Sequence, residues 1–137
     1  MVEHTTNYFD TFITIAPDSA AAEAVVPPQR ATPSVAERTY RLIAERPYEL
    51  TSDDVLFTVW ADRNDISEAD RPAARERFFS KGQACLRSSD LAKRYGWGVH
   101  SDSEGRVAII GVDTPEYAAF VADDALTVVP AMRSSRK

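Results

Sequence analysis

FFSKGQACLRSSDLAKRYGWGVHSDSEGRVAIIGV, residues 78–112, is the stretch that decides the fold. It holds all five glycines of the chain, its only cysteine and one of its two tryptophans. Because glycine permits left-handed backbone and close approach of other groups, we expect the tight turns to lie here. Residues 97–101 and 106–111 are strand candidates, and the connection 102–105 ends in a glycine that can supply a positive φ. The stretch therefore predicts a β-hairpin, preceded by one helical turn over 91–95.

The N-terminal half predicts two further strands and a helix. Residues 9–16 (FDTFITIA) are rich in β-branched and aromatic side chains, which favours a strand. Residues 55–61 (VLFTVWA) are apolar on both faces, which favours a central strand that buries Trp60. Between them, Ser34 and Glu37 have the spacing of a capping box, so a helix is expected to begin there.

Two more helices are expected downstream of the second strand. One begins near residues 67–70 and ends at Gly82, and the other begins at Thr114-Pro115-Glu116, which combines an N-cap, a first-turn proline and an acid. Residues 126–129 add a short strand. Together these elements predict an α+β domain with an antiparallel or mixed sheet of about four strands, packed with two or three helices.

Length and composition indicate one globular domain over residues 1–137, since 44% of the residues are hydrophobic and 27% are charged. Residues 18–32 are expected to form an irregular loop, and residues 132–137 a basic tail that frays. The N-terminus lacks the pattern of a secretory leader, and a single cysteine cannot form an internal disulfide, so a cytoplasmic protein is expected. No apolar run is long enough for a membrane span.

Charge is distributed unevenly along the chain. The net charge is −5, yet residues 71–106 carry 8 basic and 4 acidic side chains, a local net charge of +4. An acidic protein has little general affinity for nucleic acid, because that affinity depends on neutralising phosphates. Focused positive charge can still select a small anion.

The Lys93-Arg94-Tyr95-Gly96-Trp97-Gly98 block is the most suggestive candidate for binding. Two cations beside two aromatic rings could bind an anionic ligand, and the flanking glycines could leave room for a ring of that ligand. The alternative is that both rings belong to the core and the glycines serve a turn. The predicted ligand-binding residues are Lys81, Arg87, Lys93, Arg94, Tyr95, Trp97 and His100.

An enzyme is the alternative from another class. Cys85 lies between Lys81 and Arg87, and nearby cations favour the nucleophilic thiolate. His100, two residues before Asp102, would then act as acid or base. The competing interpretations are a small buried cysteine and a histidine in a surface turn.

No cofactor is predicted. A zinc site is not expected, because the chain has two histidines and one cysteine, and zinc needs three or four convergent ligands. The carboxylate pairs Asp53-Asp54 and Asp62, Asp65 are interpreted as turn and cap residues. A homodimer is compatible with the composition, and a structural or protein-interaction module is the third functional class.

The chain also resembles a family of short bacterial proteins, domain of unknown function 6157. The resemblance spans nearly the whole chain and implies a single-domain bacterial protein, without implying any activity. It is carried by the blocks His4-Thr5-Thr6-Asn7, Ser52-Asp53-Asp54-Val55-Leu56-Phe57, Arg63-Asn64-Asp65, Phe78-Phe79-Ser80-Lys81-Gly82-Gln83, Cys85-Leu86-Arg87, Lys93-Arg94-Tyr95-Gly96-Trp97-Gly98, His100-Ser101-Asp102 and Ala131-Met132-Arg133-Ser134.

Taken together, the sequence predicts a non-catalytic binding or regulatory domain for a small anionic, partly aromatic ligand such as a nucleotide-like metabolite. This prediction rests on the local positive charge beside Tyr95 and Trp97 in an otherwise acidic chain.

Overall fold

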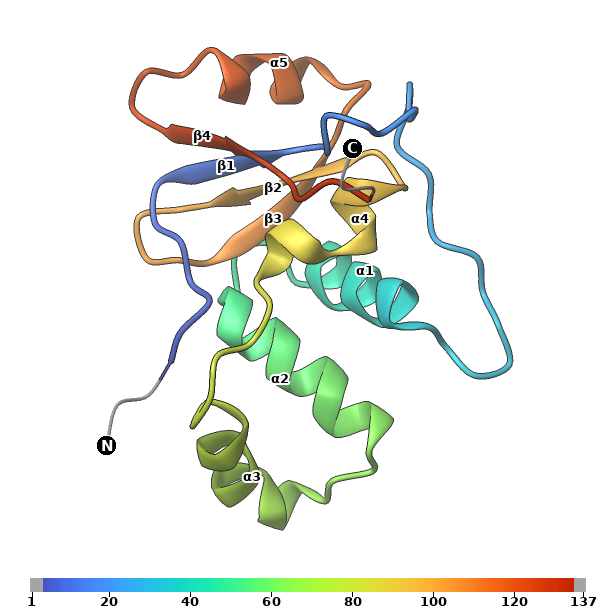
Figure 1. The fold of residues 1–137 in the computed structure, drawn as a ribbon, viewed down its shortest axis with the longest axis vertical. Coiled ribbons are helices and arrows are strands. Elements are labelled where there is room, and N and C mark those ends of the chain that lie inside the picture. The colour runs from blue at the N-terminus through green and yellow to red at the C-terminus, as the bar shows by residue number, and fades with distance from the viewer. Residues whose placement is uncertain (1–3, 135–137) are drawn as a thin grey trace.

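The computed structural model describes residues 4–134, and a four-stranded mixed sheet lies at its centre (Figure 1). The spatial order is β3-β2-β1-β4. β2 pairs antiparallel with β1 and β3, whereas β4 runs parallel to β1. The strands are β1 (Thr11–Thr14), β2 (Trp97–Ser101), β3 (Val107–Gly111) and β4 (Thr127–Pro130). The predicted α+β class with a mixed sheet is confirmed.

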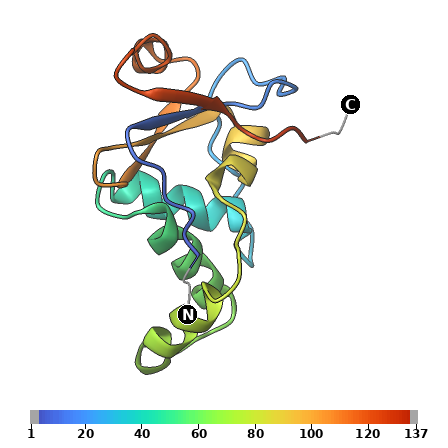
Figure 2. The same ribbon diagram turned by 60° about the vertical axis from the view of Figure 1, so that its left-hand side comes forward.

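Helices cover both faces of this sheet. The described residues form five α-helices rather than two or three, together with two short 3-10 helices. In Figure 1, α5 lies over one face of the sheet, while α1, α2 and α4 lie beyond the other and α3 lies farthest away; Figure 2 shows the same layers from the side. The helices are α1 (Val35–Glu45), α2 (Ser52–Arg63), η1 (Glu68–Asp70), α3 (Arg71–Phe78), η2 (Leu86–Ser88), α4 (Asp90–Lys93) and α5 (Pro115–Val121).

Local capping signals predicted two helix starts correctly. The Ser34 hydroxyl accepts a hydrogen bond from the backbone N–H of Glu37 at 3.1 Å, at the start of α1. The Thr114 hydroxyl accepts one from the N–H of Tyr117 at 3.3 Å, at the start of α5. Each side chain satisfies a backbone donor that the first helical turn leaves without a partner.

The expected hairpin is also present. Gly105 has φ +81°, so the glycine supplies the left-handed backbone of the turn. The Asp102 carboxylate accepts hydrogen bonds from the N–H groups of Glu104 and Arg106, both at 2.9 Å. This local network joins β2 to β3.

Residues 55–61 were predicted wrongly as a strand, because they belong to helix α2. The helix begins with a capping box in which Thr51 and Asp54 each accept a hydrogen bond from the other's backbone N–H. The apolar residues on both faces misled the prediction, because they indicate burial on two sides without telling a strand from a helix.

Two hydrophobic clusters explain why α2 is apolar all round. Val55 and Val59, one turn apart, pack in the cluster between the sheet and helices α1 and α4. Phe57 and Ala61, also one turn apart, pack on the other side against α3, in a cluster with Phe79. A helix between two cores needs two apolar stripes, and these interleave in the sequence to resemble a two-sided strand.

The predicted loop is described in full and the predicted tail only in part. Residues 18–32 contain no helix or strand. Within the predicted tail, the backbone N–H of Ser134 donates to the Asp18 carboxylate at 3.1 Å, while residues 135–137 lie outside the described residues. Among residues 4–134, no helix is both long and apolar enough to cross a lipid bilayer.

Candidate functional site

The loop 18–32 lies against the block Lys93–Gly98 and forms hydrogen bonds with it. The backbone N–H of Val25 donates to the Tyr95 carbonyl, and the indole N–H of Trp97 donates to the Val25 carbonyl, both at 2.9 Å. Gly96 has φ +79°, and a Cβ there would collide with the Glu23 carbonyl. The loop backbone therefore fills the space above Gly96.

Space over the second glycine of the block is filled as well. A Cβ on Gly98 would lie 2.7 Å from Cζ of Phe12 and 2.9 Å from a ring carbon of Tyr117. The Trp97 ring packs 5.5 Å from the Tyr40 ring, centre to centre. The two glycines thus admit the chain's own backbone and side chains, which leaves no room above them for the ring of a ligand.

The cations of the block and its surroundings have separate environments. Lys93 is half-buried on α4, and the guanidinium of exposed Arg94 lies 3.8 Å from the Asp90 carboxylate. Arg87 donates through Nε to the Pro130 carbonyl at 2.7 Å. Lys81 lies elsewhere, on the connection between α3 and η2. The predicted ligand-binding residues therefore do not form one cluster.

His100 lies on the α5 side of the sheet. Its ring stacks on Phe120 at 4.2 Å between centres, and its Nδ1 is hydrogen-bonded to the Tyr48 hydroxyl at 2.8 Å. Burial lowers the pKa of His100, while the nearby carboxylates, of which Asp102 has the largest effect, act in the opposite direction. These contacts place the imidazole within a packed aromatic group.

Cys85 lies on the other side of the sheet, near the N-terminal segment. Its Sγ is 3.5 Å from the Tyr8 hydroxyl, and this hydrogen bond together with burial raises the pKa of the Tyr8 phenol, which Arg87 opposes. Leu86 packs in the same cluster as Val99, whose strand neighbour His100 points to the opposite face. The structure therefore does not bring Cys85 and His100 together.

A hollow of about 310 Å³ next to Cys85 is lined by the N-terminal segment, and most of its polar groups already have partners. Asp53 accepts hydrogen bonds from the Thr5 hydroxyl and from both the N–H and the hydroxyl of Thr6, each at 2.7 Å. Asn7 in turn accepts from the Asp53 N–H at 2.9 Å. These bonds attach the segment to the start of α2. The interpretation as a cap residue is confirmed for Asp54, whereas the Asp53 carboxylate bonds the N-terminal segment instead.

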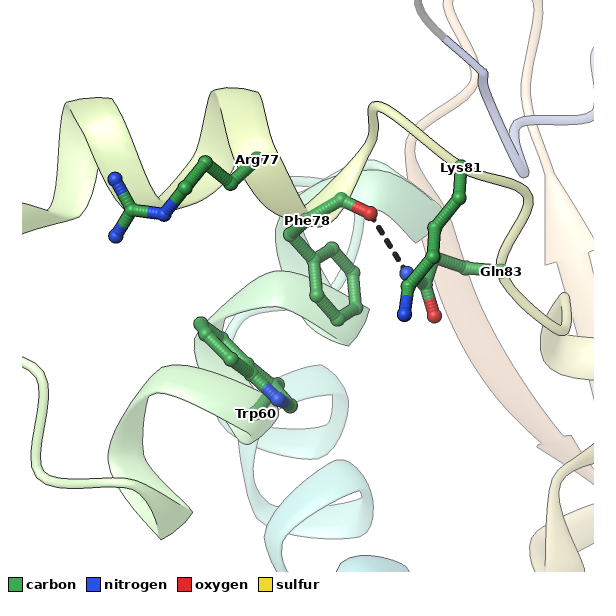
Figure 3. Close-up of a pocket in the computed structure, with 5 residues that line it drawn as sticks. All are labelled: Trp60, Arg77, Phe78, Lys81 and Gln83. Atoms are coloured by element: carbon green, nitrogen blue, oxygen red, sulfur yellow. Dashed lines mark hydrogen bonds between the residues drawn. The ribbon is translucent and has the colours of Figure 1, made fainter.

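A groove around Trp60 is lined by residues that the sequence did not predict as a site, with Lys81 as the exception. One hollow, of about 290 Å³, is lined by Trp60, Arg77, Phe78, Lys81 and Gln83 (Figure 3). In this view the Trp60 and Phe78 rings lie between Arg77 on one side and Lys81 with Gln83 on the other. The Gln83 amide donates to the Phe78 carbonyl at 2.7 Å, which fixes that wall.

A second hollow, of about 210 Å³, adjoins the first, because Trp60, Phe78 and Gln83 line both. The two hollows together are called the Trp60 groove below. The remaining residues that line the second hollow are Val35, Thr39, Leu56, Val59, Arg63 and Ala84. Helices α1 and α2 therefore contribute a largely apolar half, whereas α3 and the following connection contribute a cationic half.

Every charged side chain that lines the Trp60 groove is a cation without a partner. Arg63, Arg77 and Lys81 form no ion pair with any carboxylate within residues 4–134. Arg71 and Arg75, which line a neighbouring hollow, are instead paired with Asp62 and Asp54 at 2.8 and 2.9 Å. The groove thus combines aromatic rings with positive charge that the protein does not neutralise.

Comparison with known protein families shows to which family the chain belongs. A family model described as a family of unknown function, DUF6157, matches residues 3–137. The chain belongs to DUF6157. No curated protein and no solved structure is significantly similar to it. Membership of DUF6157 assigns no role to any residue of the chain.

One signal in this DUF6157 chain could have revealed the groove. Trp60 and Arg63 are three residues apart, and three-residue spacing brings side chains to neighbouring positions only on a helix. With residues 55–61 read as a strand, Arg63 falls in the turn that follows, so no shared face with Trp60 is expected. The wrong secondary structure for α2 therefore hid the site.

Among residues 4–134, no group of three or more His, Cys, Asp or Glu side chains could hold a metal ion.

Proposed function

We propose that this protein binds a small anionic, partly aromatic ligand in the Trp60 groove, without catalysing a reaction. The observation that carries the proposal is the presence of Arg63, Arg77 and Lys81, none of them ion-paired within residues 4–134, beside the rings of Trp60 and Phe78. The ligand class is the one predicted from the sequence, and a nucleotide-like metabolite is one member of it. Lys81 is the predicted residue that takes part.

Electrostatics favours an anion at this place. A cation that lacks a partner in the protein can form a charge-assisted hydrogen bond to a carboxylate or phosphate, about twice as strong as a neutral one. The net charge of −5 on the whole chain repels large polyanions, whereas a local group of cations still attracts a small one.

The aromatic rings favour a ligand with a flat or apolar body. Trp60 is half-buried and packs 5.2 Å from Phe78 and 5.9 Å from Phe57, between ring centres, so its orientation is fixed by neighbours. Its indole N–H has no hydrogen-bond partner among residues 4–134, and can donate to a ligand. Rigid aromatic contacts of this kind lose little entropy on binding.

The residues that line the groove support a non-catalytic role. The groove offers no carboxylate, histidine or cysteine side chain, the usual groups for acid–base or nucleophilic work. Its cations and rings supply affinity and orientation.

Fluorescence of Trp60 tests the proposal. In a Trp97→Phe background, in which Trp60 is the sole indole, phenyl phosphate, benzoate and adenosine monophosphate are titrated, and thermal stability is measured alongside. We expect phenyl phosphate to change the emission and raise the melting temperature, and Lys81→Ala to weaken its binding about tenfold.

Lys93→Ala is the matched control, since it removes the same charge from the block that the sequence favoured. Its affinity for phenyl phosphate should stay within about twofold of the parent, because Lys93 does not line the groove. No response to any of the three ligands would reject the proposed function. Weakening by Lys93→Ala instead of Lys81→Ala would move the site to the block Lys93–Gly98.

A further inference from the structure

The two halves of the Trp60 groove are each small for a ligand site. Pockets that hold small molecules range from about 300 to 1,000 Å³. The cationic half measures about 290 Å³ and the apolar half about 210 Å³, so each alone lies below that range. They share Trp60, Phe78 and Gln83 as lining, so a ligand that crosses these residues can occupy both.

The apolar half offers few groups that could recognise a polar ring. The Thr39 hydroxyl already donates to the Val35 carbonyl at 2.8 Å, and the Gln83 amide donates to the Phe78 carbonyl. Leu56 and Val59 are apolar, so the side-chain donors without a partner among residues 4–134 are the Arg63 guanidinium and the Trp60 indole N–H. A nucleobase placed here would meet mainly aliphatic side chains and would give up hydrogen bonds to water that these cannot replace, which is costly.

We propose that the ligand is a small amphipathic anion, with an anionic head at Lys81 and an apolar aryl or alkyl body that crosses Trp60 into the hollow between α1 and α2. This inference rests on the proposed function and narrows its ligand class. The head meets a cation that has no ion pair among residues 4–134, and the body meets Val35, which is 47% exposed, and Leu56.

The length of the ligand's apolar body should then control its affinity for the groove. Each methylene group that enters the apolar half leaves water, and such a transfer strengthens binding about fourfold. The gain should stop when the hollow is full. A ligand with a polar body of similar size should bind more weakly than one with an apolar body.

A series of phosphate monoesters tests the inference by calorimetric titration of the full chain. The probes are inorganic phosphate, phenyl phosphate, its 4-ethyl and 4-propyl derivatives, and adenosine monophosphate. We expect affinity to rise in that order from phosphate to the propyl compound, by about fourfold per added methylene, and adenosine monophosphate to bind more weakly than phenyl phosphate.

An Ala84→Phe variant locates the body of the ligand. Ala84 is exposed and lines only the apolar half, so a larger side chain there can fill the hollow while the fold is kept. The rise in affinity with each methylene added to the ligand should disappear in Ala84→Phe and persist in the control Ala84→Ser. Lys81→Ala should weaken every phosphate, whatever its body.

The outcomes separate the two proposals. Binding of phenyl phosphate without a chain-length gain, a gain that survives Ala84→Phe, or tighter binding of adenosine monophosphate would overturn the amphipathic ligand and leave the anion site standing. No binding by any probe would reject both.

Discussion

The two tryptophans of this protein differ in their sequence neighbours and have opposite situations in the structure. Trp97 lies next to cations and glycines, yet its indole N–H is bonded to Val25 and the space around it is filled by the protein's own loop and rings. Trp60 has no glycine beside it, yet its N–H has no partner within residues 4–134 and its neighbouring cations are unpaired. Residue types that suit recognition indicate a site only where the folded chain leaves them unused.

Truncating the two tryptophans gives the largest expected effect on stability. Trp97→Ala should lower the free energy of unfolding by about 3 kcal/mol, because it removes ring packing and the hydrogen bond that holds the loop 18–32. Trp60→Ala should cost about 2 kcal/mol, since it removes half-buried packing and no hydrogen bond. Urea unfolding measures both changes. A larger loss for Trp60→Ala would reverse the roles assigned to the two rings.

Gly96→Ala should destabilise the protein by about 2 kcal/mol. The substitution places a Cβ at φ +79° and against the Glu23 carbonyl, so both backbone strain and displacement of the loop contribute. Chemical unfolding gives the loss of stability, and limited proteolysis within residues 18–32 reports release of the loop. An unchanged unfolding midpoint would mean that the loop is not held as described.

Gly82→Ala should instead stabilise the protein, and by a smaller amount than Gly96→Ala destabilises it. A Cβ at this position would meet nothing within 4 Å, and the residue does not have a positive φ. The substitution reduces the freedom of the unfolded chain and should raise stability by about 0.5 kcal/mol, as measured by urea unfolding. A loss of more than about 1 kcal/mol would show that the connection beside the groove is less open than the space around Gly82 indicates.

The smallest expected effect comes from the pH dependence of stability through His100. Burial holds its pKa below 6.5 in the folded state, so at mildly acidic pH the unfolded chain binds more protons. Stability should therefore be complete above the unfolded pKa of about 6.5 and fall as the pH decreases toward 5. In His100→Phe, which keeps a ring against Phe120, the melting temperature should vary less between pH 7 and 5. An equal slope in both proteins would assign the dependence to other groups.

Much of the local structure could be predicted because its causes are local. Ser34 and Thr114 each bond a backbone N–H three residues away, and Asp102 bonds its own turn, so short sequence patterns indicate these features. The strand at residues 11–14 and the hairpin follow from alternation and from Gly105. The candidate groove was not predicted, except for Lys81, because its walls come from α1, α2 and the connection after α3, which are distant in the sequence.

By itself, the sequence determined the α+β class, the capped helix starts and the turn at Gly105, since these depend on backbone preferences and on contacts between near neighbours. Only the tertiary structure decided that residues 55–61 are helical, because two separate clusters bury the two apolar stripes of α2. It likewise decided which tryptophan remains available to a ligand. Whether a ring is covered depends on where a loop 72 residues away in sequence, at Val25, lies in space.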